Sequence, residues 1–361
     1  MESLFAAKKS SRLKNLLILL LCTAIIYFLS DFPFLAEYVF ARGVTRFIGF
    51  VLNTFTNYIP VSFYEFTALF LIAGGISLAA VILVMTAKKR FALVRVYLYR
   101  LVSAVVAVVA AFGLTYAPLY ERYSSLDALG LTHAEVNEEK IYAAAEYFVN
   151  LLVETSSSLS RDKDGNVLPA SEFNDLASEF NAGFDKLNSD YFNGYKVIPK
   201  KVSMSVPMSY LGITGIYFPF YAESNLNVNV PPYTLPFTMA HEMAHAKGVS
   251  RENEANGVAY ALCLYSSDSY IRYSGLMNAS AYLINRLNEE KYQELVNKLP
   301  EEILAEYANA NAHYEKYEGV IDEISSFFND LFLKSNGVQS GISSYGETAE
   351  TLVALYEKLN N

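Results

Sequence analysis

The chain has 361 residues, of which 53% are hydrophobic, and this length allows two domains with a sizeable core. Its charge is unevenly spread: residues 1–120 hold 11 Lys and Arg against 4 Asp and Glu, whereas residues 121–361 hold 17 against 33. The acidic C-terminal part argues against a nucleic-acid partner, because phosphate binding requires a basic face. Cys22 and Cys263 lie far apart in dissimilar surroundings, so no disulfide is expected.

The N-terminal third is typical of a membrane region, because it contains three long apolar runs that lack charged residues. Runs of about 20 apolar residues are long enough to cross a bilayer. A basic stretch precedes the first run, as in a signal peptide, but no small-residue cleavage site follows it. We therefore predict membrane spans over residues 15–30, 66–87 and 101–120.

Basic residues flank these spans and predict their orientation, because cytoplasmic loops are rich in Lys and Arg. One cluster precedes the first span, and a second lies in a predicted loop, residues 88–100. The N-terminus is therefore expected in the cytoplasm, and everything after Tyr120 outside it. The two clusters are Lys8, Lys9, Arg12 and Lys14, and Lys88, Lys89, Arg90, Arg95 and Arg100.

Residues 37–56 show a different pattern, in which Arg42 and Arg46 share one helical face and apolar residues share another. This pattern predicts an amphipathic helix at the outer membrane surface. A helix packed on the spans and a re-entrant element remain alternatives for residues 31–65. The apolar positions are Phe40, Val44, Phe47, Val51 and Phe55.

Residues 121–361 are expected to form an α+β domain dominated by helices. Amphipathic patterns predict helices over residues 131–156 and 171–192, with a turn-rich loop between them. Thr132 and Glu135 have capping-box spacing at the start of the first helix, which places His133 in its cap. Short segments rich in Val, Ile and Tyr predict strands or extended chain over residues 194–207, 212–220 and 225–230.

The sequence HEMAH carries the strongest chemical signal. Thr234 and Pro236 are good helix-start residues and Gly248 is a good stop, which predicts a helix of about three turns. His241 and His245 are four positions apart, so they project from one face at a spacing that lets both imidazoles bind one zinc ion.

Glu242 lies about 100° around the helix from His241, beside the metal rather than on it. A carboxylate in that position can accept a proton from water that zinc has acidified. The sequence therefore predicts a catalytic base next to the two ligands.

A catalytic zinc ion needs a third protein ligand. Ser250 is expected to cap a following helix that runs antiparallel to the first. In that arrangement Glu252 faces His245, which makes it the expected third ligand, and Asn256 can accept the ring N–H of His241. Glu254 is the alternative ligand, but it points about 160° away from Glu252 on an ideal helix.

The pattern resembles a domain-of-unknown-function family of bacterial membrane proteins with an HExxH zinc motif. The residues that carry the resemblance are 212–229, 236–256 and, more weakly, 270–275. ENEAN also resembles the ExxxD element of gluzincin metallopeptidases, with Glu252 as ligand and Asn256 in place of Asp. The resemblance implies N-terminal spans followed by a gluzincin-like zinc-peptidase domain.

Other side chains are candidates for substrate or transition-state contacts. Glu223 is the only acidic residue between positions 191 and 241, and it either binds substrate or caps a turn. Zinc peptidases usually need a donor such as His, Tyr or Arg to stabilise the transition state. Tyr273, Arg272 and His313 are available for that role.

These patterns together predict a membrane-anchored zinc metallopeptidase acting on a protein or peptide at the outer membrane face, with the lipid bilayer as its other partner. The alternative is a non-catalytic zinc-binding sensor or scaffold module at the cell surface. A third hypothesis is a zinc hydrolase that acts on cell-wall peptides.

Overall fold

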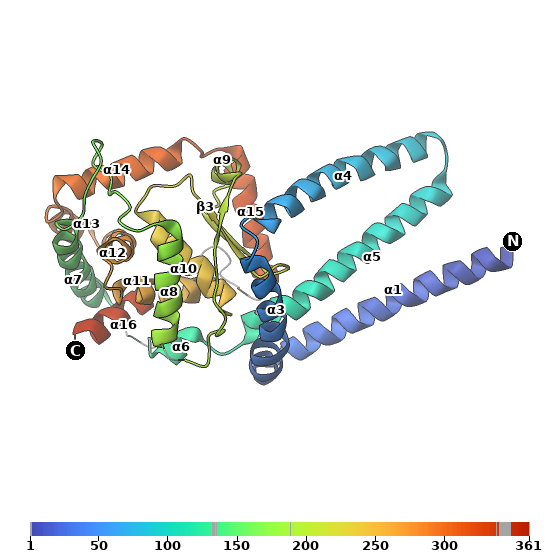
Figure 1. The fold of residues 1–361 in the computed structure, drawn as a ribbon, viewed down its shortest axis with the longest axis horizontal. Coiled ribbons are helices and arrows are strands. Elements are labelled where there is room, and N and C mark those ends of the chain that lie inside the picture. The colour runs from blue at the N-terminus through green and yellow to red at the C-terminus, as the bar shows by residue number, and fades with distance from the viewer. Residues whose placement is uncertain are drawn as a thin grey trace. The chain divides into compact units, whose positions relative to one another are not determined.

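The computed structural model describes residues 2–131, 134, 136–187, 189–336, 338 and 348–360. It is mostly helical, with a few short strands (Figure 1). The predicted capping box of Thr132 and Glu135, with His133, lies outside the described residues. The chain forms two compact units: unit 1 contains Met1–Leu52, Phe63–Arg122 and Pro219–Tyr221, and unit 2 contains Asn53–Ser62, Tyr123–Phe218 and Ala222–Asn361.

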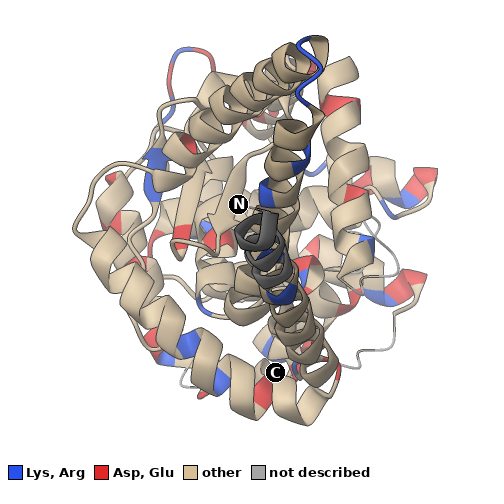
Figure 2. Ribbon diagram, turned by 90° about the vertical axis from the view of Figure 1, so that its right-hand side faces the viewer, with Lys and Arg blue, Asp and Glu red and all other residues tan. Residues whose placement is uncertain are grey.

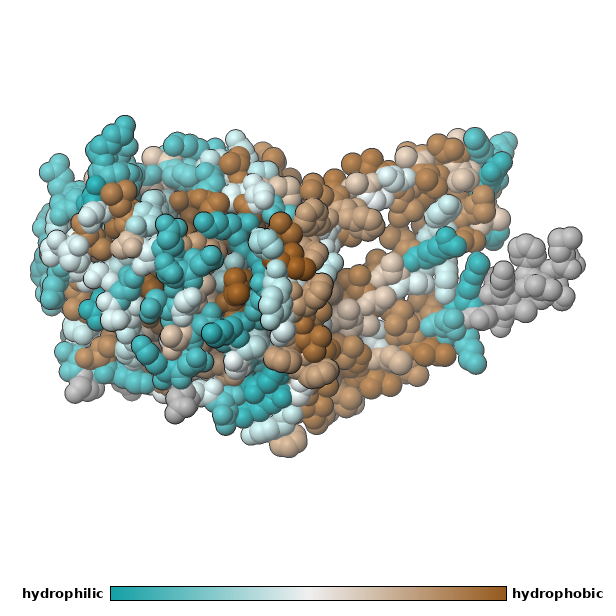
Figure 3. Space-filling view, viewed as in Figure 1, coloured by the Kyte–Doolittle hydropathy of each residue, from teal (hydrophilic) through white to brown (hydrophobic). Residues whose placement is uncertain are grey.

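Unit 1 is built from long apolar helices. Three of its described segments are long and apolar enough to cross a membrane, which indicates membrane association; they are Arg12–Ser30, Phe63–Ala87 and Phe91–Thr115. Their surfaces are largely hydrophobic (Figure 3). The helices of this unit are α1 (Glu2–Ser30), α2 (Pro33–Leu35), the π-helix η1 (Ala36–Val44), the first part of α3 (Thr45–Asn57), α4 (Phe63–Ala87), α5 (Phe91–Thr115) and the 3-10 helix η2 (Ala117–Glu121).

The third long helix begins ten residues earlier than the sequence predicts. Instead of a loop over residues 88–100, a short turn joins α4 to α5 around Lys89, which has a φ of 53°. Figure 2 shows Lys and Arg at this turn. Arg95 and Arg100 lie within α5, and both side chains are exposed. Their charge alone therefore did not mark a loop.

Residues 37–56 are helical, as their pattern predicts, but the first part is a π-helix. The carboxylate of Glu37 is 1% exposed and accepts hydrogen bonds from Arg42 Nε at 2.7 Å and from Arg122 Nε at 2.9 Å. Arg122 is itself 2% exposed. Arg42 is thus engaged by a buried carboxylate, and this ion pair ties η1 to the end of η2 within unit 1.

Unit 2 has a core in which α12 packs against α7 and against α11, and α10 packs against α11. Tyr270, Tyr273 and Phe148 are its largest fully buried side chains. The helices are α6 (Ser125–Leu129), α7 (Glu138–Ser156), α8 (Phe173–Leu187), α9 (Ser205–Tyr210), α10 (Thr234–Ala246), α11 (Glu252–Leu264), α12 (Ser269–Ile284), α13 (Glu289–Val296), α14 (Glu301–Glu315), α15 (Val320–Ser335) and α16 (Thr348–Asn360).

Two helices begin away from the expected residues. The predicted helix over residues 131–156 is helical in α7 only from Glu138, because Asn137 accepts a hydrogen bond from the Lys140 amide and caps it. The short helix α9 replaces part of the extended segment predicted over residues 194–207. There Ser205 accepts a bond from the Val228 amide, and its hydroxyl donates to the Val202 carbonyl.

A small mixed sheet positions α10. Its strands are ordered β1-β3-β2, with β3 (Glu223–Asn227) parallel to β1 (Lys200–Val202) and antiparallel to β2 (Gly215–Phe218). Helix α10 packs on β3 and β2. The hydroxyl of Ser224 donates to the main-chain carbonyl of Glu242 at 2.8 Å, so the sheet is bonded to the helix beside its two histidines.

Candidate metal centre

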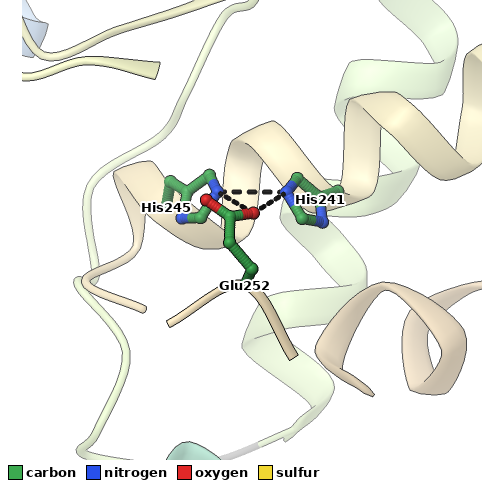
Figure 4. A group of neighbouring side chains, drawn as sticks. All are labelled: His241, His245 and Glu252. Atoms are coloured by element: carbon green, nitrogen blue, oxygen red, sulfur yellow. Dashed lines mark hydrogen bonds and ion pairs between the residues drawn. The ribbon is translucent and has the colours of Figure 1, made fainter. Parts of the chain in front are cut away.

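Three side chains of unit 2 bring one potential metal ligand each to a common point (Figure 4). His241 Nε2 lies 3.0 Å from His245 Nε2 and 3.1 Å from Glu252 Oε2, and His245 Nε2 lies 3.5 Å from the same carboxylate oxygen. The side chains of His241 and Glu252 are 12% and 15% exposed, so the cluster is not sealed from solvent.

The local sequence explains this convergence. Both histidines lie on α10, which ends at Lys247; Gly248 then adopts a φ of 99°, a left-handed conformation that favours glycine. The chain reverses within four residues, and α11 begins at Glu252. The prediction that Ser250 caps this helix is wrong. Arg251 occupies the N-cap position and makes no side-chain cap, and Ser250, one residue before it, is buried.

The hydrogen bonds of the two Nδ1 atoms determine which imidazole nitrogens are available for a metal. His245 Nδ1 lies 2.7 Å from the Val249 carbonyl, which can only accept, so Nδ1 carries the proton and Nε2 carries a lone pair. His241 Nδ1 lies 2.9 Å from Asn256 Oδ1, which sets the same tautomer. In their neutral forms the two imidazoles therefore direct lone pairs at one another and at the carboxylate.

This donor set fits a zinc ion. Zinc binds imidazole nitrogen and carboxylate oxygen at about 2.0–2.2 Å in tetrahedral geometry, which places neighbouring ligand atoms roughly 3.3 Å apart. The three observed separations, 3.0, 3.1 and 3.5 Å, lie around that value. A cation between the three atoms would replace repulsion between lone pairs with coordination, without rearrangement of the helices.

The electrostatics of the cluster also favour a positive charge. Burial lowers the pKa of His245, but the nearby Glu252 carboxylate outweighs burial and raises that pKa to about 9. Burial raises the pKa of Glu252, yet the two imidazoles hold it well below its usual range. In the absence of a metal, a proton on His245 Nε2 therefore lies between these groups, and a divalent cation would replace that proton.

Glu242 is buried beside the cluster rather than in it. Its side chain is 5% exposed, and burial raises the pKa of its carboxyl. The Tyr217 amide donates a hydrogen bond to the carboxylate, while Oε2 has no hydrogen-bond partner among the described residues. A buried carboxylate with an open oxygen and a raised pKa has the properties of a general base or acid.

Strand β2 leaves room for that carboxylate only because it begins with glycine. A Cβ atom at Gly215 would lie 2.6 Å from Cγ and Oε1 of Glu242. The Asn227 amide donates to the Thr214 carbonyl, so the alternation of an antiparallel ladder turns the main-chain groups of Gly215 and Tyr217 away from β3. Glu242 and the outer edge of β2 therefore lie on the same side.

Glu254, the alternative third ligand, has other partners. Its Oε2 accepts hydrogen bonds from the amide and hydroxyl of Ser125, both at 2.8 Å, and Oε1 accepts one from Arg251 at 3.0 Å. These bonds hold the start of α6 against α11. Of the two carboxylates, only Glu252 is directed at the histidines.

Four residues are candidates for substrate or transition-state contacts, and the structure describes the surroundings of each. Glu223 is 2% exposed at the start of β3, where it raises the pKa of Lys200 against the effect of burial. The hydroxyl of Tyr273 donates to Glu306 at 2.6 Å and accepts from Arg161 at 2.9 Å. Arg272 is exposed on α12, and His313 Nε2 lies 2.9 Å from the Asn229 carbonyl. The described contacts join none of these four to the donor atoms.

Sequence reasoning missed the residues that support the cluster from outside the HEMAH segment. Ser224 and Tyr217 bond to Glu242 from the sheet, and Gly215 makes space for it. The Val249 carbonyl fixes a histidine tautomer. The sequence predicted that GITGIYFPF is extended. It did not predict the contacts of this segment with Glu242, because main-chain hydrogen bonds and packing in the folded protein leave no signal in residue spacing.

Comparison with known proteins shows that a family model matches most of the chain. Residues 40–353 match a family model described as "Protein of unknown function (DUF3810)". No curated protein and no solved structure matches the chain. The match covers the second and third long apolar helices and the three converging side chains. The chain therefore belongs to the DUF3810 family, whose function is uncharacterised.

Proposed function

We propose that this protein is a membrane-anchored, zinc-dependent metallopeptidase of the gluzincin kind. The observation that carries the proposal is the convergence of His241, His245 and Glu252 on one point, with their donor atoms 3.0–3.5 Å apart. Catalytic zinc sites typically have three protein ligands, whereas structural sites have four. Among the described residues this group has three donors and no fourth member. That number favours a catalytic site over a purely structural one.

Zinc held there would supply Lewis acidity, lowering the pKa of water and polarising a peptide carbonyl. The protein's own part in the reaction falls to Glu242. Its open Oε2 would accept the proton of the attacking water, and the resulting carboxyl would return that proton to the leaving amine. Asn256 keeps His241 in the tautomer that presents Nε2.

The substrate would bind as an added strand at the edge of the sheet. β2 is an edge strand, and the outward main-chain groups of Gly215 lie on the side of Glu242, whose carboxylate already binds the Tyr217 amide. An extended peptide pairs with such an edge through main-chain hydrogen bonds and needs no particular side chains. This geometry suits a polypeptide substrate better than a small molecule.

For the topology, we propose that the N-terminus is cytoplasmic and that residues 121–361 form an extracytoplasmic peptidase domain after the membrane region, residues 1–120. The support is the positive charge in the N-terminal part of α1 and at the turn between α4 and α5. The substrate is then a protein or peptide at the outer membrane face. Protease accessibility of the C-terminal part in intact cells and in inverted vesicles tests this orientation.

The function is tested with purified full-length protein offered a library of peptides and muropeptides. Glu242→Gln removes the base but no ligand, so we expect normal zinc content and a loss of hydrolysis of at least about 100-fold. Glu252→Gln should lose both zinc and hydrolysis. Unchanged turnover in Glu242→Gln would contradict its role as base, and cleavage of muropeptides alone would narrow the substrate to cell-wall peptides.

A further inference from the structure

Helix α15 exposes its apolar residues. Six large hydrophobic side chains are each more than half exposed on this one helix, and they recur at the three- and four-residue spacing of a single face. Soluble domains normally turn such a face inward. The exposed fractions are 69% for Val320, 56% for Ile321, 52% for Ile324, 64% for Phe327, 61% for Phe328 and 54% for Leu331.

The side of α15 opposite its apolar face carries the contacts of this helix that the structure describes. On an ideal helix the six residues fall within an arc of about 120°, and Leu333 lies roughly opposite the centre of that arc. Leu333 is 1% exposed, so the helix is buried at this position on its opposite side. Asp322, also on that side, approaches the main chain of Gly212: a Cβ there would lie 2.4 Å from Asp322 Oδ1. The apolar face is thus more than half exposed at all six positions, whereas the opposite side carries the contact with Gly212 and the buried Leu333, next to the exposed Ser326.

We propose that α15 lies in the headgroup–acyl boundary of the bilayer, with its apolar face in the lipid. The chain itself supplies the reason to choose lipid as the occupant. It contains three helices long and apolar enough to span a membrane, and it crosses between units 1 and 2 five times, each time within one peptide bond. Unit 2 is therefore tethered to membrane helices without a linker, and an amphipathic helix of this kind lies flat in an interface.

The charges of α15 specify the lipid. Asp322, Glu323 and Asp330 outnumber Lys334, so the helix carries no basic face that would attract anionic headgroups. Binding then depends on apolar area, with Phe327 and Phe328 as the largest side chains of the face. The occupant is accordingly a zwitterionic phospholipid surface, and anionic lipid should not improve the contact.

The chain contains no tryptophan, which allows a direct test. Full-length Phe328→Trp and Ser326→Trp are each placed in phosphatidylcholine nanodiscs, with and without bromine on the upper acyl chain. Ser326 is exposed and lies about 160° around the helix from Phe328, so it is the matched control. We expect brominated lipid to reduce the tryptophan emission of the Phe328→Trp protein at least about twofold, and to leave that of the Ser326→Trp protein within about 20% of its value in plain lipid.

A second tryptophan variant on the same face controls for misfolding caused by a single substitution. Phe327→Trp lies on the same face and should be quenched like Phe328→Trp. Equal and weak quenching in all three variants would overturn the proposal. So would emission from the Phe328→Trp protein that shifts with protein concentration but not with bromination, because that result would assign the face to a second copy of the chain.

Discussion

Replacing Gly215 by alanine is the sharpest perturbation of the proposed base, because it displaces the Glu242 carboxylate without changing the identity of any proposed catalytic or ligand residue. The added Cβ would lie 2.6 Å from Cγ and Oε1 of Glu242 and 2.8 Å from its Cδ. Ordinary contact begins at 3.4 Å, so the carboxylate must retreat by roughly 0.8 Å. A displacement of about 1 Å from reactive geometry typically costs about 100-fold in rate.

We therefore expect Gly215→Ala to lower kcat/KM about 100-fold, equivalent to about 2.7 kcal/mol of transition-state stabilisation. Zinc content should stay normal, because the three ligands are untouched. Gly194→Ala is the control: it also lies in unit 2, and a Cβ there meets nothing within 4 Å. Turnover is measured on the peptide that the library identifies, with zinc content and the unfolding temperature measured in parallel. A folded, zinc-loaded Gly215→Ala protein with unchanged turnover would refute the placement of Glu242.

Two further expectations concern the residues around the cluster. Asn256→Ala removes the acceptor 2.9 Å from His241 Nδ1 and should weaken zinc affinity about 10- to 100-fold in a competitive chelator titration, whereas Asn256→Asp should strengthen it; equal affinities would contradict the tautomer argument. Lys200 is 3% exposed and burial lowers its pKa, so between that lowered pKa and the usual 10.5 the unfolded chain binds the extra proton and stability rises with pH. Denaturant unfolding at pH 8–11 should show this rise in the difference between wild type and Lys200→Met, and a difference independent of pH would contradict it.

The ligand cluster could be anticipated from sequence because it is built from local rules. His241 and His245 share a helical face by their spacing alone, and Gly248 predicts the chain reversal that brings the next helix back beside them. A short turn between two helices then leaves few ways to place Glu252 and Asn256. The structure brings Asn256 to His241 and Glu252 to both histidines, with His241 the nearer of the two, while Glu254 bonds to Ser125 instead.

The surroundings of the cluster could not be anticipated, because they depend on long-range packing. Glu242 is held by Ser224 and Tyr217, which precede it by 18 and 25 positions and reach it only after the sheet forms. The same limit explains Tyr273, whose hydroxyl was a candidate donor but is held by Arg161 and Glu306 in the core. Residue type made Glu242 and Tyr273 candidates, but their hydrogen-bond partners depend on the tertiary structure.

The long apolar helices show a similar division. Hydropathy identified them, but charge misplaced the start of α5, because Arg95 and Arg100 lie inside this helix rather than in a loop. Glu37 gave no sequence signal of its buried bonds to Arg42 and Arg122, since Arg122 is distant in the chain. Helix α15 has an apolar stripe in its sequence, but only the structure reveals that this stripe faces outward.

The central claim is that two imidazoles and Glu252 hold one zinc ion, and elemental analysis of purified full-length protein tests it most directly. The account predicts about one zinc per chain in the wild type and in Glu254→Gln, and none in Glu252→Gln or His245→Ala. A wild-type protein without zinc, or a Glu252→Gln protein that keeps it while Glu254→Gln loses it, would contradict the account.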